Sequence, residues 1–498
     1  MQPLSRRRAL QLGGLGLAST AVGAAGLTWR AAAGFTPALP AALVEPPTLT
    51  SAEGLLQVRL EAATGSVQIA GRPATALSYN GGLPGPTLRL QPGDRLQVQL
   101  VNRLTDPTNL HVHGLHVSPE GNSDNPFVKI DPGSTFDYDY QLPDDHPPGV
   151  YWYHPHHHCM VADQIFGGLY GAIIVGDPEG SAGSIPVTRE RVLVVSDISL
   201  TTSGAIQAPT AMARMRGREG DLVLVNGQAR PTMTARPGER ERWRIINACA
   251  ARYLRLRLDG QHLQLLGLDS GRFAPPRDVD EVVLAPGNRA DLLVTTTAGT
   301  SQLNALPYNR GNTMGMGMGS GMGDDTQASS TSELVLATLD VAGEEAPTLP
   351  AVAAQPNPRD LRRAVVARRR ELTFAMGMGM GMGGGGGGSG MSFTIDGKEF
   401  DAARTDQTVQ AGSVEEWTIT NTSPMDHPLH LHVWPMQLIE EKGQPLGPPT
   451  WQDVVNVPAR SNVKVRVAFD RFAGRTVYHC HILDHEDQGM MGVINART

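Results

Sequence analysis

The sequence has few cysteines and no long apolar run beyond its N-terminal segment. Three cysteines among 498 residues do not make a disulfide framework. A bond between Cys159 and Cys249 is possible in an oxidising compartment, but nothing in the sequence brings them together, so we do not expect it. Past the N-terminal segment no apolar run is long enough to span a bilayer, which excludes a membrane span in the mature chain.

Basic charge and aromatic side chains are also scarce. The chain has 42 Lys and Arg against 49 Asp and Glu, with a net charge of −7 and a pI near 6.1. This balance gives no electrostatic reason to expect a nucleic-acid partner. Aromatic residues make up 5% of the chain, whereas glycine (57) and proline (37) are abundant. Such a composition is typical of a turn-rich β protein rather than of a helical bundle.

The N-terminus has the layout of an export signal. Arg6, Arg7 and Arg8 form a basic start, an apolar Gly/Ala-rich stretch follows, and small residues at Ala31–Gly34 offer a cleavage site. The Ser-Arg-Arg start resembles a twin-arginine signal. A membrane anchor is the alternative, but the many glycines and the small residues favour cleavage. We expect residues 1–33 to be removed on export to the periplasm, the cell surface or the extracellular space.

One sequence layout recurs three times, in QPGDRLQVQLVNRL (91–104), RPGERERWRIINA (236–248) and QAGSVEEWTITNTS (410–423). Each copy begins with a turn, continues with a charged residue and ends as a strand that finishes in Asn. This internal repeat predicts three related β-sandwich domains, in line with a soft prior of about 150 residues per domain. We place the domains at 48–178, 186–345 and 370–498, with a linker over 346–369.

Ten of the 15 histidines fall in four clusters, two in the first predicted domain and two in the third. The clusters are HVH (111–113), HPH (154–156), HPLHLH (427–432) and HCHILDH (479–485). Residues i and i+2 lie on one face of a strand, so each cluster presents a His-X-His pair. If the first and third domains face each other, eight imidazoles converge on one metal cluster, and imidazole suits copper, zinc and iron. Solvated or core histidines would not repeat this parity four times.

Cys480 stands between two of these histidines and must point to the opposite face of its strand. His427 is off the parity of its own pair, and His485 and Met490 follow Cys480 on a predicted loop. One thiolate, two imidazoles and a methionine form the ligand set of a blue-copper site. The spacing therefore predicts a single copper on one face and a metal cluster on the other, joined by one short peptide.

The stretches HVHGLH, YWYHPHHH, MDHPLHLHVWP and HCHILDHEDQGMMG together resemble, in this order, the four copper motifs of three-domain multicopper oxidases. The opening NGGLPGPTLRLQPGD of the first domain resembles the same family, and the bacterial laccase-like and cuprous oxidase members are the most similar. The resemblance covers most of the mature chain. It implies an all-β fold of three cupredoxin-like Greek-key β-sandwich domains, four copper ions and dioxygen as the oxidant.

The resemblance also implies the ligands. A type 1 copper would be held by His427, Cys480, His485 and Met490; a type 2 copper by His111 and His430; and a type 3 pair by His113, His154, His156, His432, His479 and His481. Electrons would enter at exposed edges of the two type 1 histidines. They would then pass from Cys480 through its flanking histidines to the cluster where oxygen is reduced.

Reduction of dioxygen to water needs protons, which carboxylates near the cluster would supply. The resemblance points to Asp124 and Glu486 for this role. Asp124 lies two residues later than the common family spacing, so its loop is predicted to carry a two-residue insertion. The alternative for either acid is a solvated loop carboxylate.

The second motif departs from the family, because Cys159 stands where glycine usually follows the last histidine. We expect Cys159 to be a small buried hydrophobe, and the alternative is a reactive thiol near copper. His157 and His158 are expected to support the ligands or to lie at the surface.

Two runs rich in Met-Gly repeats carry eight of the 18 methionines: Met314, Met316, Met318, Met322, Met376, Met378, Met380 and Met382. A solvated glycine-rich linker is the alternative interpretation. Thioethers are soft ligands that prefer Cu(I), and an ordinary linker has no reason to repeat them. We therefore expect these runs to capture Cu(I) and pass it to the type 1 site.

These patterns favour a multicopper oxidase that couples one-electron oxidation of a reducing substrate, Cu(I) before phenols, to reduction of dioxygen to water. A broad laccase that acts on phenols, with incidental Met runs, would share every ligand. A copper nitrite reductase is normally two-domain and lacks an eight-histidine cluster. A copper-storage protein or scaffold of this fold is the non-enzymatic alternative, although scaffold relatives lose their ligands. We expect a monomer.

Overall fold

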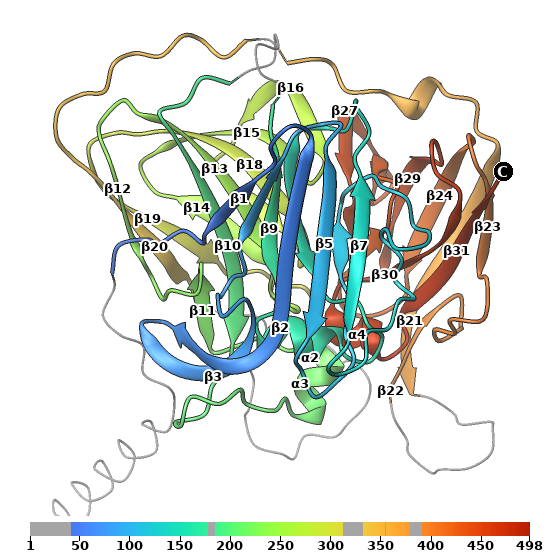
Figure 1. Ribbon diagram of the computed structural model, residues 1–498. Helices are drawn as coiled ribbons and strands as arrows, with labels where there is room; N and C mark the ends of the chain where they lie inside the picture. Colours follow the sequence, from blue (N-terminus) through green and yellow to red (C-terminus); the bar gives the residue numbers. More distant parts are fainter. Residues whose placement is uncertain (1–40, 178–184, 312–331, 354, 379–390) are drawn as a thin grey trace, which may run out of the picture.

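The chain folds almost entirely into β-strands, which confirms the predicted all-β class (Figure 1). The computed structural model describes residues 41–177, 185–311, 332–353, 355–378 and 391–498. Within these ranges the strands form six sheets, which pack in pairs as three β-sandwiches. The predicted export signal lies outside the described residues. Across the described ranges, no helix has both the length and the apolar character needed to span a membrane.

The first sandwich packs a four-stranded sheet on a five-stranded one. The former has the order β3 (Arg72–Tyr79), β2 (Leu55–Ile69), β5 (Arg95–Asn102) and β7 (Thr135–Gln141). The latter has the order β1 (Thr48–Thr50), β4 (Thr87–Leu90), β9 (Gly171–Val175), β8 (Gly149–His154) and β6 (His111–His113). Leu56, Val58 and Leu60 alternate along β2 with polar residues and face the shared core. Helix α2 (Val161–Gly167) lies between β8 and β9.

The second sandwich packs a six-stranded sheet on a five-stranded one. The former has the order β11 (Leu222–Val225), β10 (Arg189–Ile198), β13 (Arg240–Asn247), β18 (Arg289–Thr295), β15 (His262–Leu268) and β16 (Gly271–Asp278). The latter has the order β12 (Thr232–Ala235), β20 (Leu334–Val341), β19 (Gly299–Leu306), β14 (Leu254–Leu258) and β17 (Val282–Leu284). Helix α3 (Ala211–Arg216) lies between β10 and β11.

The third sandwich repeats this plan after a short 3₁₀ helix, η2 (Leu361–Arg363). Its six-stranded sheet has the order β22 (Met391–Ile395), β21 (Arg368–Met378), β24 (Val414–Asn421), β29 (Ser461–Ala468), β26 (Met436–Glu441) and β27 (Gln444–Gln452). Its five-stranded sheet has the order β23 (Gln407–Gln410), β31 (Met491–Arg497), β30 (Gly474–Cys480), β25 (His427–Leu431) and β28 (Val454–Val457). Helix α4 (Leu483–Asp487) follows β30.

The repeated sequence layout corresponds to β5, β13 and β24, which occupy equivalent places and pair in parallel with β2, β10 and β21. In each repeat the final Asn closes the next loop in the same way. Its Oδ1 accepts a backbone N–H bond from two residues later, at 2.9, 3.1 and 2.9 Å for Asn102, Asn247 and Asn421. Its Nδ2 donates to two backbone carbonyls. This buried amide satisfies both of its polar ends, which accounts for the recurrent Asn.

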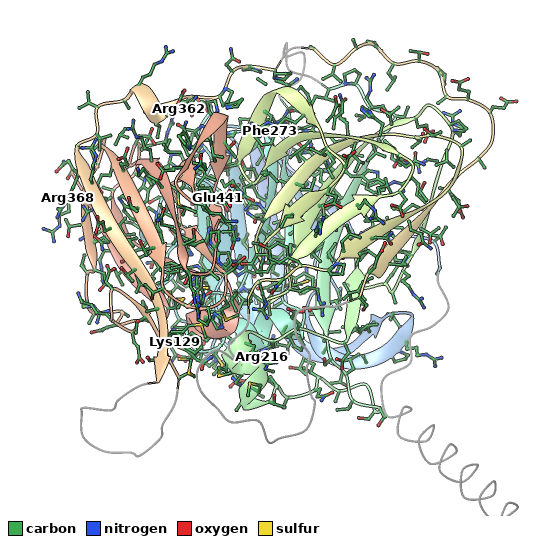
Figure 2. The ribbon with its side chains drawn as sticks, turned by 180° about the vertical axis from the view of Figure 1, so that it is seen from behind. Lys129, Arg216, Phe273, Arg362, Arg368 and Glu441 are labelled. Atoms are coloured by element: carbon green, nitrogen blue, oxygen red, sulfur yellow. The ribbon has the colours of Figure 1, made fainter. Side chains whose placement is uncertain are left out.

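All three sandwiches touch one another. In Figure 1 the first (blue to cyan) lies between the second (green to yellow) and the third (orange to red), and Figure 2 shows the second and third side by side from behind. Strand β16 of the second sandwich contacts β27 of the third. Helices α2, α3 and α4 gather at one end of the molecule, where α4 contacts both others (Figure 1).

Candidate metal centre

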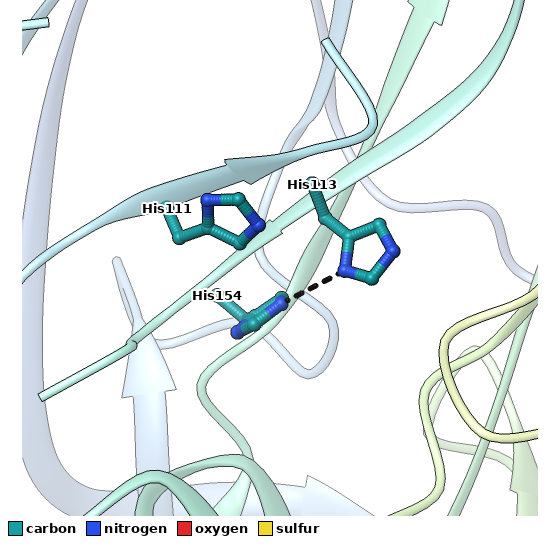
Figure 3. Close-up of side chains that lie close together, drawn as sticks. All are labelled: His111, His113 and His154. Carbon is teal, nitrogen blue, oxygen red and sulfur yellow. Dashed lines mark hydrogen bonds between the residues drawn. The ribbon is translucent and has the colours of Figure 1, made fainter. Parts of the chain in front are cut away.

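Four strands bring the histidine clusters together. β6 pairs antiparallel with β8, and their register places His111 opposite His154 (Figure 3). β25 pairs antiparallel with β30 and places His430 opposite His479. The equivalent strands of the second sandwich, β14 and β19, contain no histidine. The first and third sandwiches therefore supply the clusters, as the sequence predicts.

The pairs do not converge in quite the way that strand alternation predicts. Only His111 and His113 both lie within one strand. β8, β25 and β30 each end before the second histidine of their pairs. Pro155 follows β8 directly and has no N–H to continue the ladder. His156, His432 and His481 therefore reach the cluster from positions just beyond the ends of β8, β25 and β30.

The eight paired histidines are 0–2% exposed, and ring nitrogens of His111 and His430 face each other. Their Nε2 atoms are 3.3 Å apart. Nδ1 of His111 lies 2.9 Å from a carboxylate oxygen of Asp124, and Nδ1 of His430 lies 2.8 Å from the carbonyl oxygen of Asp453. Both Nδ1 atoms donate to oxygen, so the two Nε2 atoms meet lone pair to lone pair. A cation bound by both nitrogens would stabilise that arrangement.

A second group forms around His479. The Nε2 atoms of His156 and His432 lie 3.1 and 3.2 Å from its Nε2. Burial, followed by the charge of nearby imidazoles, lowers the pKa of His432 well below its usual range. A neutral imidazole is the form that binds a metal.

A third group lies across the cluster. Nδ1 of His113 is 3.3 Å from Nε2 of His154, the contact drawn in Figure 3. The ring centroids of His113 and His481 are 5.0 Å apart. Neither nitrogen of the buried His481 has a hydrogen-bond partner within the described residues. An orphaned buried imidazole is costly unless a metal takes its lone pair, so this donor set fits the copper ions that the motifs imply.

Cys480 belongs to a separate group on the other face of β30. The register pairs Cys480 with Leu429 and the preceding residue, His479, with His430, so the thiol points away from the cluster. Nδ1 of His427 lies 3.3 Å from the Cys480 sulfur and 3.3 Å from Nδ1 of His485. Burial raises the pKa of the Cys480 thiol, so its thiolate form needs a bound cation.

Met490 and His485 complete this group. Met490 is fully buried in the same apolar cluster as Cys480, and its carbonyl accepts the Cys480 N–H at 3.0 Å. His485 lies in the short helix α4 rather than on the predicted loop. The sulfur and the two Nδ1 atoms fit a copper ion of the blue type.

The predicted exposed edges of the type 1 histidines are wrong, because both His427 and His485 are 0% exposed. Nε2 of His485 donates to the carbonyl of Met215 in α3, at 3.1 Å. Nε2 of His427 bonds to the hydroxyl of Ser423 at 2.8 Å. A segment of the second sandwich thus covers the edge where the motif alone suggests an opening.

Both predicted acids lie at the cluster. Asp124 is buried, and both its oxygens lie within 3.0 Å of Nδ1 of His111, while Oδ1 also accepts the Val112 N–H. Burial raises the pKa of Asp124 to about 8 in the metal-free chain. Its carboxyl therefore holds a proton over much of the neutral range.

Glu486 is fully buried and lies 3.0 Å from Nδ1 of His479 and 3.3 Å from Nε2 of His156. Burial alone would raise the pKa of Glu486, but the two imidazoles outweigh it and lower the pKa to about 2 in the metal-free chain. The two acids thus start from opposite protonation states on either side of the cluster.

Asp453 is a member of the site that the motifs missed. It is buried, and its carboxylate lies 3.0 Å from Nε2 of His113. It precedes β28 in a stretch, WQDVVNV, that carries no metal-ligand spacing. Its only sequence signal is an acid directly before an apolar run, which is too common to single out.

Cys159 is exposed, so the preferred prediction of a buried hydrophobe is wrong. It sits in the turn before α2 with φ +68°, in the left-handed region that residues other than glycine rarely adopt. Its thiol lies 3.8 Å from the carbonyl of Asp487, and desolvation followed by the Asp487 charge raises its pKa, which disfavours a reactive thiolate. No disulfide joins Cys159 to Cys249, as expected.

His157 and His158 are partly buried, and the ring of His158 packs on Phe400 at 4.7 Å. Of the Met-run residues, Met376 is 6% exposed and packs in the apolar core that contains Cys480, so it does not offer its thioether to solvent. The backbone of Met378 lies in β21. The other six, Met314, Met316, Met318, Met322, Met380 and Met382, lie outside the described residues.

Comparison with known proteins agrees with this geometry. Three multicopper oxidase family profiles match residues 61–180, 192–305 and 380–498. The structure is similar to a multicopper oxidase from Campylobacter jejuni described as a metallo-oxidase, with a TM-score of 0.79 and 30% identity over 93% of this chain and 96% of that one. Multicopper oxidase mco of Staphylococcus haemolyticus is 27% identical over 429 residues, covering 84% of each chain. Copper resistance protein A of Pseudomonas syringae is 31% identical over 279 residues, 47% of this chain and 44% of that one.

The chain belongs to the multicopper oxidase family, whose members use copper as their cofactor. Both laccases and copper resistance proteins are among its relatives; the laccase of Bacillus subtilis is 24% identical over 483 residues, 84% of this chain and 90% of that one. The family thus leaves the reducing substrate of this chain open.

Proposed function

We propose that the chain oxidises a reducing substrate by single electrons, with Cu(I) as the favoured substrate, and reduces dioxygen to water. Oxidation of four Cu(I) to Cu(II) balances the uptake of four electrons and four protons by one dioxygen, which gives two waters. The observation that carries the proposal is the peptide His479-Cys480-His481. Its thiol lies with His427 and His485 in one group of potential metal ligands. On the other side, His479 lies with His156 and His432, and the ring of His481 packs beside that of His113.

We assign the ligands as the motifs imply. Bound copper would supply one-electron redox chemistry at the thiolate site and the place where dioxygen takes up electrons at the cluster. His427, Cys480, His485 and Met490 would hold the type 1 ion, His111 and His430 the type 2 ion, and His113, His154, His156, His432, His479 and His481 the type 3 pair. The peptide on either side of Cys480 then links the two sites through bonds alone.

The two acids have different tasks in this proposal. Asp124 holds a proton on its carboxyl beside His111 and can release it toward the cluster. Glu486 stays ionised in the metal-free chain and acts on His479 through its charge, 3.0 Å from Nδ1, while that nitrogen donates to the carbonyl of Cys480 at 3.1 Å. Proton supply from Asp124 and the charge of Glu486 are both needed for turnover.

Cu(I) is favoured over a phenol for two reasons. The repeated thioethers of the Met-Gly runs are ligands that Cu(I) prefers. The buried edge of His485 lies under the α3 backbone, so a bulky ring has no direct contact with that ligand. A laccase acting mainly on phenols, with incidental Met runs, is the second candidate, supported by the laccase relatives.

Oxygen uptake tests the proposal. Purified, copper-loaded chain is supplied with Cu(I) or with a phenol, and the same assay is run on a variant with Met314, Met316, Met318, Met322, Met380 and Met382 all changed to Leu. Loss of Cu(I) oxidation with phenol oxidation retained supports cuprous oxidation. Equal loss of both, or no loss, favours the laccase. No oxygen uptake and no blue colour would favour the storage or scaffold alternative. The proposed export is tested separately, by cell fractionation with Arg6, Arg7 and Arg8 replaced by Lys.

A further inference from the structure

The second sandwich contributes none of the assigned ligands, yet one of its turns reaches the cluster. The turn joins β17 to β18 and spans residues 285–288, and Arg289 opens β18. Arg289 is 0% exposed and donates two hydrogen bonds to the carboxylate of Asp453 in the third sandwich. Nη1 bonds to Oδ1 at 2.5 Å and Nη2 to Oδ2 at 2.6 Å. A paired guanidinium and carboxylate of this kind fix each other's plane as well as position.

Asp453 in turn forms hydrogen bonds with two histidines of the cluster. Its Oδ1 accepts from Nε2 of His113 at 3.0 Å, and its backbone carbonyl accepts from Nδ1 of His430 at 2.8 Å. A proton held on Nε2 leaves Nδ1 of His113 as the ligand nitrogen, and a proton held on Nδ1 leaves Nε2 of His430. The orientation of Asp453 therefore sets the tautomer of both rings.

The same sandwich also holds the backbone of Asp453. Oδ2 of Asp269 accepts the N–H groups of Asp453 and Val454, each at 3.1 Å. Nδ2 of Asn288, in the turn itself, donates to Asp269 at 2.9 Å and to the carbonyl of Val454 at 2.9 Å. The start of β28 is thus fixed from outside its own domain.

The turn touches a third histidine through Gly287. Its φ is +87°, and a Cβ placed there would lie 2.9 Å from Cε1 and Nε2 of the His481 ring. That ring has no hydrogen-bond partner among the described residues, so packing alone limits its rotation, and Gly287 is one of its packing contacts, together with His113 and Trp152. Only a residue without a side chain allows the ring and the backbone to approach this closely.

We propose that the β17–β18 turn is a positioning element for the copper cluster, with Arg289 acting through Asp453 on His113 and His430, and Gly287 acting on His481. The inference rests on the proposed copper sites. It gives the ligand-free middle domain a defined part in metal binding, and it predicts that copper affinity depends on a domain that never touches the metal.

The test measures copper affinity in the full chain by competition with a chelator, and the hyperfine pattern of the type 2 ion by electron paramagnetic resonance. Arg289→Lys keeps the charge but loses one of the two bonds, and Arg242→Lys is its matched control. Arg242 pairs in the same two-pronged way with Asp291, at 2.8 and 2.6 Å, and its other carboxylate partner is Asp177. Gly287→Ala is matched by Gly238→Ala, a turn glycine with φ +77° whose added Cβ would meet Glu345 at 3.4 Å.

We expect Arg289→Lys and Gly287→Ala to weaken copper binding at the cluster by roughly 10- to 100-fold, the usual cost of disturbing an outer-shell partner, and to keep the type 1 colour. Arg289→Lys should also alter the type 2 hyperfine pattern, while both controls match the parent chain. Equal effects in variants and controls, or none in either, overturn the inference. If Arg289→Lys does not fold, Gly287→Ala decides. Failure of the unaltered chain to take up copper would instead defeat the proposed function.

Discussion

Arg218 of the second sandwich donates to Asp484 in α4 of the third through Nη2 at 2.6 Å and through its own backbone N–H at 2.8 Å. Both side chains are buried, and a further guanidinium nitrogen bonds Asp163 in α2 of the first sandwich. One side chain therefore joins all three sandwiches at the helix that carries His485 and Glu486.

Arg218→Met should destabilise the metal-free chain by about 3–5 kcal/mol, because it leaves the Asp484 carboxylate buried without its partner. The midpoint of denaturant unfolding measures the loss. Arg95→Met is the control, since Arg95 is exposed and solvent screens its pair with Asp139, so its loss should change the midpoint little. Similar midpoints for the two variants would contradict a stabilising role for the Arg218–Asp484 pair.

Cys480→Ser should abolish the blue absorption and lower the copper content by one ion per chain, because the thiol belongs only to the group with His427 and His485. The cluster histidines lie on the opposite face of β30 and should keep their copper. Metal analysis and absorption spectra provide the measurement, and Cys159→Ser, on an exposed turn, is the control. Loss of all copper would show that the two sites do not assemble independently.

Asp124→Asn and Glu486→Gln should each slow dioxygen reduction and leave the blue absorption intact. The loss should be roughly 10²- to 10⁴-fold for Asp124, whose carboxyl supplies the proton in the proposed function. Both side chains touch cluster histidines and neither touches Cys480 or His427 in the described residues. Stopped-flow reoxidation of the reduced protein separates this step from substrate oxidation. Turnover at the rate of the unaltered chain in both variants would remove the acids from the mechanism.

Acid should weaken the six-stranded sheet of the second sandwich, where Asp291 of β18 pairs with Arg242 of β13. Asp291 is buried; burial alone would raise its pKa, but Arg242 and Arg244 outweigh it and hold the pKa below the usual value. A carboxyl with a lowered pKa stabilises the fold fully above the unfolded value of about 4, and this stability is lost as the pH falls toward the folded pKa.

The change to test this is Asp291→Asn. It should lower stability at neutral pH and flatten the loss of stability below about pH 4, as followed by unfolding midpoints across that range. Asp137→Asn removes an exposed acid whose side chain bonds to the neutral amide of Gln99 instead, and should leave the slope nearly unchanged. A steep acid dependence that survives in Asp291→Asn would place the acid-labile groups elsewhere.

The sequence predicted the parts of the fold that depend on local pattern. Strand alternation and the repeated Asn pointed to three sandwiches, and the spacing of histidines around Cys480 pointed to two metal groups on opposite faces of one strand. Both predictions rest on the period of a strand, which is a property of a few consecutive residues.

The sequence did not predict what depends on packing between sandwiches. The buried edge of His485, the role of Asp453 and the reach of Gly287 all arise where a residue of the second sandwich meets the third. The prediction that Cys159 is buried was wrong for a related reason. Its exposure depends on how the turn before α2 packs on the rest of the chain, and the adjacent residues of the sequence do not determine that packing.

The carbonyl of Met215 covers the ring edge of His485, so the outer side of α3 and the copper ligand beneath it belong to different residues. With His485 as the proposed point of electron entry, a donor would approach across α3, and the copper ligand lies beneath that helix. Replacing the exposed side chains of α3 would then change which donors are accepted, because the contact with His485 is made by the backbone carbonyl of Met215 and not by those side chains. Under that proposal, a library restricted to the exposed side chains Met212 and Arg214 would vary substrate preference and leave the metal ligands unchanged.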